Sequence, residues 1–241
     1  MEEATEEALS GGFVAAAVRV GDTVRKRPPR DPEFVHGLLL FFERSGWRGA
    51  PRFLGSDDSG RDVLEFLDGT VPWQRAPDSG LAAVGRLIRE FHDLTAGTPS
   101  AGDQEVVCHH DLSPKNTVYR GTEPVAFIDW DDAAPGRRVQ DVAHACWQFA
   151  RLGPDATDAG PKIRAIADGY ELNAADRAVL VDTILWWQDA TWRGILAGAD
   201  AGDPAMVRLR DDGIVDQIRA AYEWTSRHRA ELEPGSPKVL S

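Results

Sequence analysis

The sequence predicts an α+β fold, with a small antiparallel sheet in the first part of the chain and mainly helices after it. Short β-branched runs separated by turn residues, together with one helical stretch, occupy residues 11–67, whereas helical spacing of apolar residues dominates from Leu81 onward. The chain has 241 residues, of which 42% are hydrophobic and 27% are charged. It is therefore long enough to bury a sizeable core and has the composition of an ordinary globular protein.

The elements of the first part follow from turn residues and from periodicity. Gly21-Asp22 lies between two β-branched runs, which predicts a hairpin within residues 11–28. Apolar residues recur near helical spacing over residues 33–46, which predicts one helix. The strands expected next are 51–55 and 61–67, joined by a turn at 57–60.

Helices are expected to make up most of the remaining chain. The apolar stripe from Leu81 to Leu94 predicts a helix that ends at Gly97. Asn173 is a typical N-cap, and Asp203-Pro204 would place proline in the first turn of a new helix. The other helices expected are Val139–Ala150, one from Asn173 to about Ala199, and one from Asp203 to about His228.

The segment from Val106 to Asp129 carries the chemistry, and it reads VVCHHDLSPKNTVYRGTEPVAFID. Asp111 and Asn116 follow the first apolar run, and Asp129 ends the last one. An acid, an amide and a second acid are thus expected at the ends of neighbouring strands. A carboxylate that orients an attacking hydroxyl, beside oxygen ligands that hold a metal ion on phosphates, is what phosphoryl transfer requires.

The pattern HxDxxxxN, followed by an apolar strand and IDxD, resembles the aminoglycoside phosphotransferase family, the small-molecule branch of the protein-kinase-like fold. The resemblance extends from about Gly11 to about Ala150. It implies a bilobal protein-kinase-like fold, in which residues 1–67 form a nucleotide-binding lobe and residues 68–241 form a catalytic and substrate lobe. The hinge between the lobes is expected at about 64–69.

The resemblance also implies roles for individual residues of the motif. Asp111 is expected to be the catalytic base, and Asn116 and Asp129 are expected to bind Mg²⁺. Asp131 is expected to support this metal site or to bind a second metal ion. A turn or cap role is the alternative for each of these acids.

Three further residues flank the expected base. His109 occupies the motif histidine and is expected to brace the catalytic loop, and Asp141 matches the aspartate at a helix start behind that loop. His110 stands where relatives usually have glycine, and its role is left open. Ser113 replaces the lysine that is typical of protein kinases, which favours a small-molecule kinase.

The nucleotide side is expected to use a basic residue of the third strand. Arg25 fits the register, because Val24 corresponds to the apolar residue before the family's lysine. Lys26 would point to the other face of a regular strand, although a one-residue bulge would give the role to Lys26 or Arg27. The partner glutamate on the next helix is not evident, since Glu33 comes too early and Glu43 too late.

Other nucleotide contacts are expected at the hinge and at a glycine-bearing turn. Backbone groups of Glu65 and Leu67 would pair with the adenine ring. Gly11-Gly12 would lie over the phosphates. ATP is the expected nucleotide, with GTP not excluded, and Mg²⁺ is the expected metal ion.

The charge and the cysteines bear on partners and location. The net charge is −12, which argues against a general nucleic-acid binder and is compatible with a cationic substrate or with simple solubility. The cysteines, Cys108 and Cys146, lie in apolar runs and are expected to be reduced. The acidic N-terminus does not resemble a signal peptide, and no run is long enough for a membrane helix, so a cytoplasmic location is expected. The sequence does not predict an oligomeric state.

The expected activity is that of a small-molecule kinase that phosphorylates a hydroxyl of a small, cationic molecule, such as an aminoglycoside antibiotic or an amino-alcohol. Aromatic and acidic residues around Trp186, Trp187 and Trp192 could grip an amine, although core packing also explains them. One alternative is a degenerate, nucleotide-binding or immunity protein without turnover. A metal phosphohydrolase of the HD type would use His92, the His109-His110-Asp111 run and Asp129. It is disfavoured, because that family resembles all-helical folds and the runs that flank these residues favour strands.

Overall fold

The computed structural model describes residues 6–9, 17–72 and 76–235, so the expected turn at Gly11-Gly12 lies outside the described residues. The chain divides into two compact units. One unit, here called the sheet unit, holds Met1–Ala76 and Glu90–Arg137. The other, the helical unit, holds Pro77–Arg89 and Arg138–Ser241. The helix α2 contributes residues to both units.

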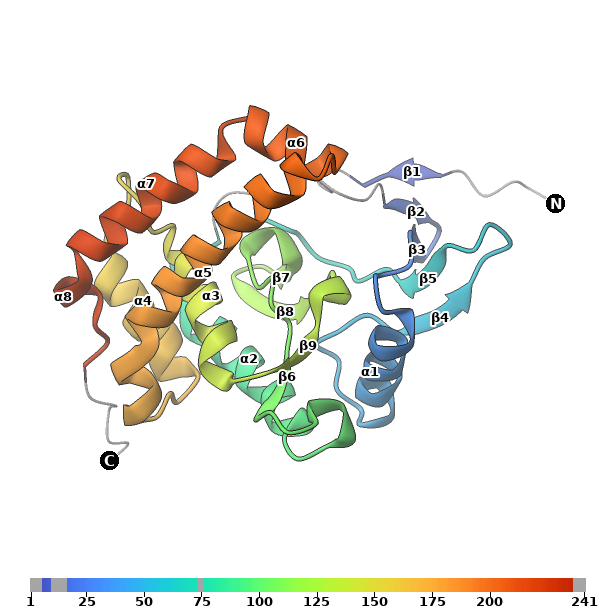
Figure 1. Cartoon of the computed structure of the whole chain (residues 1–241). Coiled ribbons are helices and arrows are strands. Elements are labelled where there is room, and N and C mark those ends of the chain that lie inside the picture. The colour runs from blue at the N-terminus through green and yellow to red at the C-terminus, as the bar shows by residue number, and fades with distance from the viewer. Residues whose placement is uncertain (1–5, 10–16, 73–75, 236–241) are drawn as a thin grey trace. The chain divides into compact units, whose positions relative to one another are not determined.

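A five-stranded antiparallel sheet forms the first part of the sheet unit, in the order β1-β2-β3-β5-β4 (Figure 1). The hairpin expected at Gly21-Asp22 joins β2 to β3, and Gly21 has a positive φ of 60° that suits glycine. In the β3–β5 pairing, Lys26 lies directly opposite Asp62. The strands are β1 (Glu7–Ala8), β2 (Val18–Val20), β3 (Thr23–Lys26), β4 (Phe53–Ser56) and β5 (Asp62–Glu65).

The helix α1 (Pro32–Arg44) follows β3 and precedes β4 in the chain. It is the helix that the apolar spacing predicts. The carboxylate of Asp31 caps it by accepting a hydrogen bond from the backbone N–H of Phe34, 3.2 Å away. Its buried stripe includes Leu38, Leu39 and Phe42. The stripe turns toward the unit interior, so the helix is held by burial of one face rather than by propensity alone.

The second part of the sheet unit consists of short strands that position the loops of the motif. β7 (Thr117–Arg120) and β8 (Glu123–Phe127) form a hairpin, and β6 (Val106–Cys108) pairs with β9 (Ala134–Gly136). The loops after β6 and β8 carry Asp111 and Asp129. All three residues of β6 are completely buried, which fixes the point from which the motif loop leaves the core.

The helical unit is built from α2 up to Arg89 and from six later helices. The helix expected from Asp203 to about His228 is in fact two helices, because Gly213 adopts a left-handed φ of 77° between them. The helix α4 had no expected counterpart. The helices are α2 (Leu81–Thr95), α3 (Arg138–Ala150), α4 (Ala159–Gly169), α5 (Ala174–Asp200), α6 (Pro204–Asp211), α7 (Ile214–Arg227) and α8 (Arg229–Leu232).

Two glycines let α2 and α4 approach each other closely within the helical unit. A Cβ atom on Gly169 would lie 2.1 Å from the carbonyl oxygen of Ala82, and one on Gly85 would lie 2.3 Å from that of Ile166. Neither position could take a larger residue without moving backbone atoms. The glycines thus set the distance between the helices.

The remaining expectations about the chain concern its thiols and membranes. Cys108 and Cys146 are buried and unlinked, and burial raises the pKa of the Cys146 thiol. No helix in the described ranges has the length and apolar character that crossing a bilayer requires.

Candidate active site

His109 ties the motif loop to the end of β8. Its imidazole is completely buried, its Nδ1 accepts the Asp111 backbone N–H at 3.2 Å, and its Nε2 lies 3.0 Å from the carbonyl oxygen of Ile128. Because Nδ1 accepts, Nε2 carries the proton and donates it to that carbonyl. One neutral ring thus bridges the loop of Asp111 and the residue before Asp129.

The carboxylate of Asp111 is held on one side by two neighbours from its own loop. Asn116 Nδ2 donates to Asp111 Oδ2 at 2.7 Å and to the Asp111 carbonyl oxygen at 2.9 Å. Lys115 Nζ lies 3.2 Å from the same Oδ2. Oδ1 of Asp111 has no hydrogen-bond partner among the described residues, and 27% of the side-chain surface is exposed. An accessible, oriented carboxylate oxygen is what a base for a hydroxyl requires.

Asp129 lies directly beyond β8 in a left-handed conformation, with φ of 63°. Its Oδ1 lies 2.6 Å from Nζ of Lys26, and Oδ1 of Asp131 lies 2.7 Å from the same ammonium. Lys26 is nearly buried, whereas 49% of the Asp129 side chain is exposed. Two carboxylates therefore converge on one buried cation, and one of them also faces solvent.

The pKa values of these groups show which interactions dominate. Burial lowers the pKa of Lys26, but the two carboxylates more than compensate, so that the pKa is raised. Burial raises the pKa of Asp129, yet the Lys26 ammonium outweighs it and the net shift is downward. For Asp131 burial prevails over Lys26, and the charge on Asp129 adds to it, so its pKa is raised. The single cation therefore favours ionisation of Asp129 more than that of Asp131.

The structure brings Lys26, and not Arg25, to the acidic pair. Arg25 donates to the hydroxyl of Thr23 at 2.6 Å and lies 3.8 Å from Asp57. The strand is regular, so the two side chains point to opposite faces as expected, and it is Lys26 that faces Asp129. The assignment of Arg25 by register is thus not supported by the geometry, and Arg27 lies beyond the end of β3.

The helix α1 contacts the sheet through a different pair from the expected lysine and glutamate. His36 Nε2 lies 2.8 Å from Oδ2 of Asp62, the residue opposite Lys26. Glu43 is 3.8 Å from Arg52, and neither Glu33 nor Glu43 contacts Lys26 in the described part of the chain. The described contact between α1 and the strand residue opposite Lys26 is thus made by a histidine and an aspartate.

At the expected hinge, Glu65 and Leu67 differ in availability. The backbone N–H of Glu65 donates to the Arg52 carbonyl at 3.0 Å, and its carboxylate accepts from Arg52 Nε at 3.2 Å. The backbone N–H and carbonyl of Leu67 make no hydrogen bond with any described residue. Of the two, Leu67 can offer both groups to a base.

His110 adopts a left-handed conformation with φ of 64°. Glycine adopts this conformation without strain, which gives a physical reason why relatives usually have glycine at this position. Histidine tolerates this region better than most residues. Its Nδ1 lies 3.2 Å from the carbonyl oxygen of Asp132. Burial, and then the charges on Asp111 and Asp129, raise the pKa of Asp132. Lys115 was not singled out from the sequence, although it lies within the HxDxxxxN motif.

The donor set is suitable for a hard divalent cation. The amide oxygen of Asn116 accepts no hydrogen bond from a described residue, and half of the Asp129 side chain faces solvent. Oxygen donors of this kind, together with phosphate oxygens and water, are what Mg²⁺ prefers. The ammonium of Lys26, which lies against Asp129, shows that the surroundings of this carboxylate favour positive charge.

The helical unit carries the other residues that the sequence singled out. Asp141 lies in the first turn of α3 and is completely buried. On α5, Trp187 Nε1 donates to the Gln140 carbonyl at 2.8 Å, while 51% of the Trp186 surface is exposed. The guanidinium groups of Arg193 and Arg219 lie over the Trp192 ring, 4.3 and 4.8 Å from its centroid. The roles expected for Asp141 and for the tryptophans stay predictions.

The five-stranded sheet with its helix, the loop that orients Asp111 and the Lys26–Asp129 pair define a phosphotransferase of the kinase-like class. The chain belongs to the Phosphotransferase enzyme family, whose model matches residues 48–178. The fold class and the family expected from the motif are thereby confirmed.

The similar proteins are a relative found by sequence and two solved structures found by their fold. The trifolitoxin immunity protein of Rhizobium leguminosarum bv. trifolii is 29% identical over 263 aligned positions, covering 95% of this chain and 97% of that protein. Among solved structures, a choline/ethanolamine kinase family protein from Mesorhizobium loti has a TM-score of 0.66 at 17% identity, covering 96% and 93% of the two chains. The ADP and streptomycin complex of APH(3'')-Id from Streptomyces rimosus has a TM-score of 0.56 at 15% identity, covering 75% and 92%. At these identities the structural likeness shows the fold.

Proposed function

We propose that this protein transfers the γ-phosphoryl group of ATP to a hydroxyl of a small, cationic molecule, such as an aminoglycoside or an amino-alcohol. The observation that carries the proposal is the orientation of Asp111. Asn116 and Lys115 hold its Oδ2, and its Oδ1 is left for the hydroxyl. The Lys26–Asp129 pair supports the nucleotide half of the same proposal.

In the reaction, Asp111 accepts a hydrogen bond from the acceptor hydroxyl and takes its proton late. The new O–P bond forms as the bond between the γ-phosphorus and the β–γ bridging oxygen breaks, and ADP leaves with that oxygen. Asn116 and Asp129 would hold Mg²⁺, and the bound ion would neutralise negative charge on the phosphates. Lys26 steadies phosphate oxygens while remaining near Asp129. Lys115 lies close enough to Asp111 to stabilise charge on the group in transfer. Catalysis is then mainly positioning and electrostatics.

The nucleotide and the acceptor are argued from different observations. Leu67 offers a free backbone donor and acceptor to the base, which suits ATP and also admits GTP. The net charge of −12 favours a cationic acceptor, since a cleft of one sign concentrates the opposite charge. Neighbouring structures contain gentamicin or streptomycin, which supports an aminoglycoside-like acceptor for this chain. A cytoplasmic location, where ATP and Mg²⁺ are supplied, is part of the proposal.

The test is calorimetry of ADP with and without Mg²⁺, on the wild-type protein, Asp129→Ala and Asp111→Ala. We expect the magnesium dependence to disappear in Asp129→Ala, because a ligand is lost, and to persist in Asp111→Ala. Turnover with a panel of cationic hydroxyl compounds should fall at least about 100-fold in Asp111→Ala. A folded wild-type protein that binds neither ADP nor GDP would overturn the proposal.

The relative with an immunity function favours a second candidate. In it, the protein protects its host by binding a toxin without turnover. The phosphotransferase and the binding-only candidates are distinguished by host survival under toxin challenge. The test compares the wild-type protein with Asp111→Asn, a variant whose side chain has nearly the same shape. Survival with this variant favours binding alone, whereas loss of survival favours phosphorylation of the toxin or of another acceptor.

A further inference from the structure

Asp62 is a buried acid of β5 whose two carboxylate oxygens have different surroundings. Its Oδ2 lies 2.8 Å from Nε2 of His36, a residue of α1. Its Oδ1 is also shielded from solvent, yet it makes no hydrogen bond with any described residue. Only 3% of the residue's surface is exposed, so bulk water does not satisfy this oxygen. A buried acceptor without a donor is costly, and such an oxygen requires an explanation.

The ammonium of Lys26 is the donor that matches this oxygen. Lys26 lies directly opposite Asp62 in the β3–β5 pairing. Opposite residues of an antiparallel pair project from the same face of the sheet with Cβ atoms about 4.5–5.5 Å apart, a gap that a lysine side chain can span. The ammonium has three N–H groups, and within the described chain its hydrogen-bond partners are Asp129 and Asp131. One donor of Lys26 and one acceptor of Asp62 are therefore unassigned on the same face of the sheet.

Two other elements of the sheet unit hold the carboxylate of Asp62 in place. Because a carboxylate only accepts, Nε2 of His36 carries the proton and donates it to Oδ2. The ring of His36 in turn stacks on Phe53 of β4, with centroids 3.8 Å apart and an angle of 14° between the planes. The direction in which Oδ1 points is thus fixed by α1 and β4 before any nucleotide binds.

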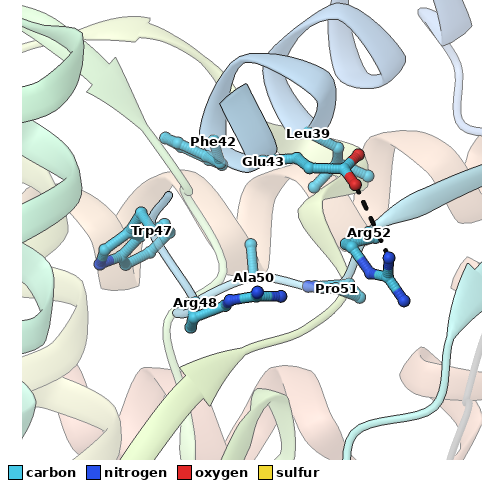
Figure 2. A pocket seen from close by; sticks show the side chains of 8 residues that line it. All are labelled: Leu39, Phe42, Glu43, Trp47, Arg48, Ala50, Pro51 and Arg52. Carbon is cyan, nitrogen blue, oxygen red and sulfur yellow. Dashed lines mark ion pairs between the residues drawn. The ribbon is translucent and has the colours of Figure 1, made fainter. Parts of the chain in front are cut away.

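The acids of α1 do not hold Lys26, although kinases pair the phosphate-binding lysine of β3 with a carboxylate of the next helix. Glu43 lies 3.8 Å from Arg52 instead, and Figure 2 shows this ion pair at the end of α1. Glu33 is exposed in the first turn of the helix, and no hydrogen bond or ion pair joins it to Lys26 among the described residues. The helix contributes His36 to Asp62, which is the acid opposite the lysine.

We propose that Asp62 is the positioning residue for Lys26: when nucleotide binds, Oδ1 of Asp62 accepts a hydrogen bond from the Lys26 ammonium, while His36 holds Oδ2. This inference rests on the proposed function, because Lys26 is the residue that steadies the phosphates. Of the three N–H groups, one then reaches Asp129, one a phosphate oxygen and one Asp62, so the contact with Asp131 is given up. A lysine whose side chain is already held on one side loses less freedom when it binds phosphate.

The proposal is tested by calorimetry of ADP with Mg²⁺. Asp62→Asn keeps the size of the side chain and an oxygen that can accept from His36, but it removes the charge that would hold Lys26. We expect this variant to bind about tenfold more weakly than the wild type, since a charge-assisted hydrogen bond is lost. Asp62→Glu, which keeps the charge, should bind within about threefold of the wild type. Glu43→Gln, a matched control that removes a carboxylate from α1, should bind as the wild type does.

A double-mutant cycle separates positioning of Lys26 from a purely structural role of Asp62. If Asp62 acts through the lysine, Asp62→Asn should weaken ADP binding by less than about twofold in the Lys26→Met background. A structural role would weaken binding by the same factor in both backgrounds. His36→Leu carries the same test should Asp62→Asn fail to fold, as urea unfolding would show. It removes the support of Oδ2 and should weaken binding about threefold, again only when Lys26 is present.

Two results would overturn the proposal. One is ADP binding of wild-type strength in both Asp62→Asn and His36→Leu. The other is a loss of affinity that is equally large with and without Lys26, which would make the role of Asp62 structural. Both results are read on a wild-type protein that binds ADP, so they leave the phosphotransferase proposal standing. A wild-type protein that binds neither ADP nor GDP would overturn both proposals, so the two failures are distinguishable.

Discussion

Nζ of Lys26 lies 2.6 Å from Oδ1 of Asp129, although the two residues are 103 positions apart in the chain. The contact joins the end of β3 to the residue beyond β8. It places the nearly buried ammonium of Lys26 on the acid that is proposed to hold Mg²⁺. Lys26 and the metal ion would therefore share Asp129 when the nucleotide is bound.

Replacing Lys26 should weaken nucleotide binding far more than replacing Arg25. We expect Lys26→Met to reduce the affinity for ADP about tenfold or more, because a nearly buried cation at the phosphates is lost. Arg25→Gln should change it less than about twofold, since Arg25 contacts Thr23 and Asp57 instead. Calorimetry on both variants checks this, and equal losses would restore the assignment of Arg25.

Lys26 should also control the pKa of Asp129. The pair contributes stability above the unfolded-state pKa of an aspartate, about 3.9, and loses it as the pH falls through the lower folded-state pKa. On the alkaline side, the contribution of Lys26 is present below 10.5 and is lost as the pH rises through its raised pKa. In Lys26→Met, a carboxyl titration followed by ¹³C NMR should therefore give a higher pKa for Asp129. An unchanged pKa would mean that the pairing does not persist in solution.

Alanine should have opposite effects on stability at Gly169, where α2 and α4 approach closely, and at Gly194, where no atom is near. Gly169→Ala should lower the free energy of unfolding by about 1–3 kcal/mol, because the new methyl group meets the Ala82 backbone. Gly194, inside α5, has no atom within 4 Å of a built Cβ. Gly194→Ala should therefore stabilise by about 0.5–1 kcal/mol through helix propensity. Urea unfolding of both variants measures these changes. An unchanged free energy of unfolding in Gly169→Ala would contradict the close packing of α2 and α4.

The left-handed conformation of His110 predicts that glycine is tolerated there. His110→Gly should leave the free energy of unfolding unchanged or raise it by up to about 1 kcal/mol, because strain at positive φ is relieved while the contact to Asp132 is lost. Urea unfolding measures this directly. A loss of more than about 2 kcal/mol would show that the contact with the Asp132 carbonyl outweighs the backbone strain. His110→Ala, which keeps the strain and removes the contact, is the matched control.

Much of the fold was predictable because local signals decide it. The Gly21-Asp22 turn, the stripe of α1 and the caps at Asn173 and Asp203 are properties of neighbouring residues, and the elements that they predict were found. The exception within this group is the helix expected from Asp203 to His228. There, Gly213 could continue a helix or break it, and its left-handed conformation in the structure separates α6 from α7.

The sequence by itself determined the family, because Asp111, Asn116 and Asp129 lie in a motif whose residue types and spacing are read directly from the chain. It could not decide between Arg25 and Lys26, because that choice depends on which face of β3 meets the end of β8. Only the tertiary structure shows that Lys26, rather than Arg25, lies beside Asp129 and Asp131. The same holds for Asp62, which meets His36 of α1 and lies opposite Lys26 of β3. Side chains from separate elements meet there because burial of apolar surface brings the elements together, and no local pattern records which of them will touch.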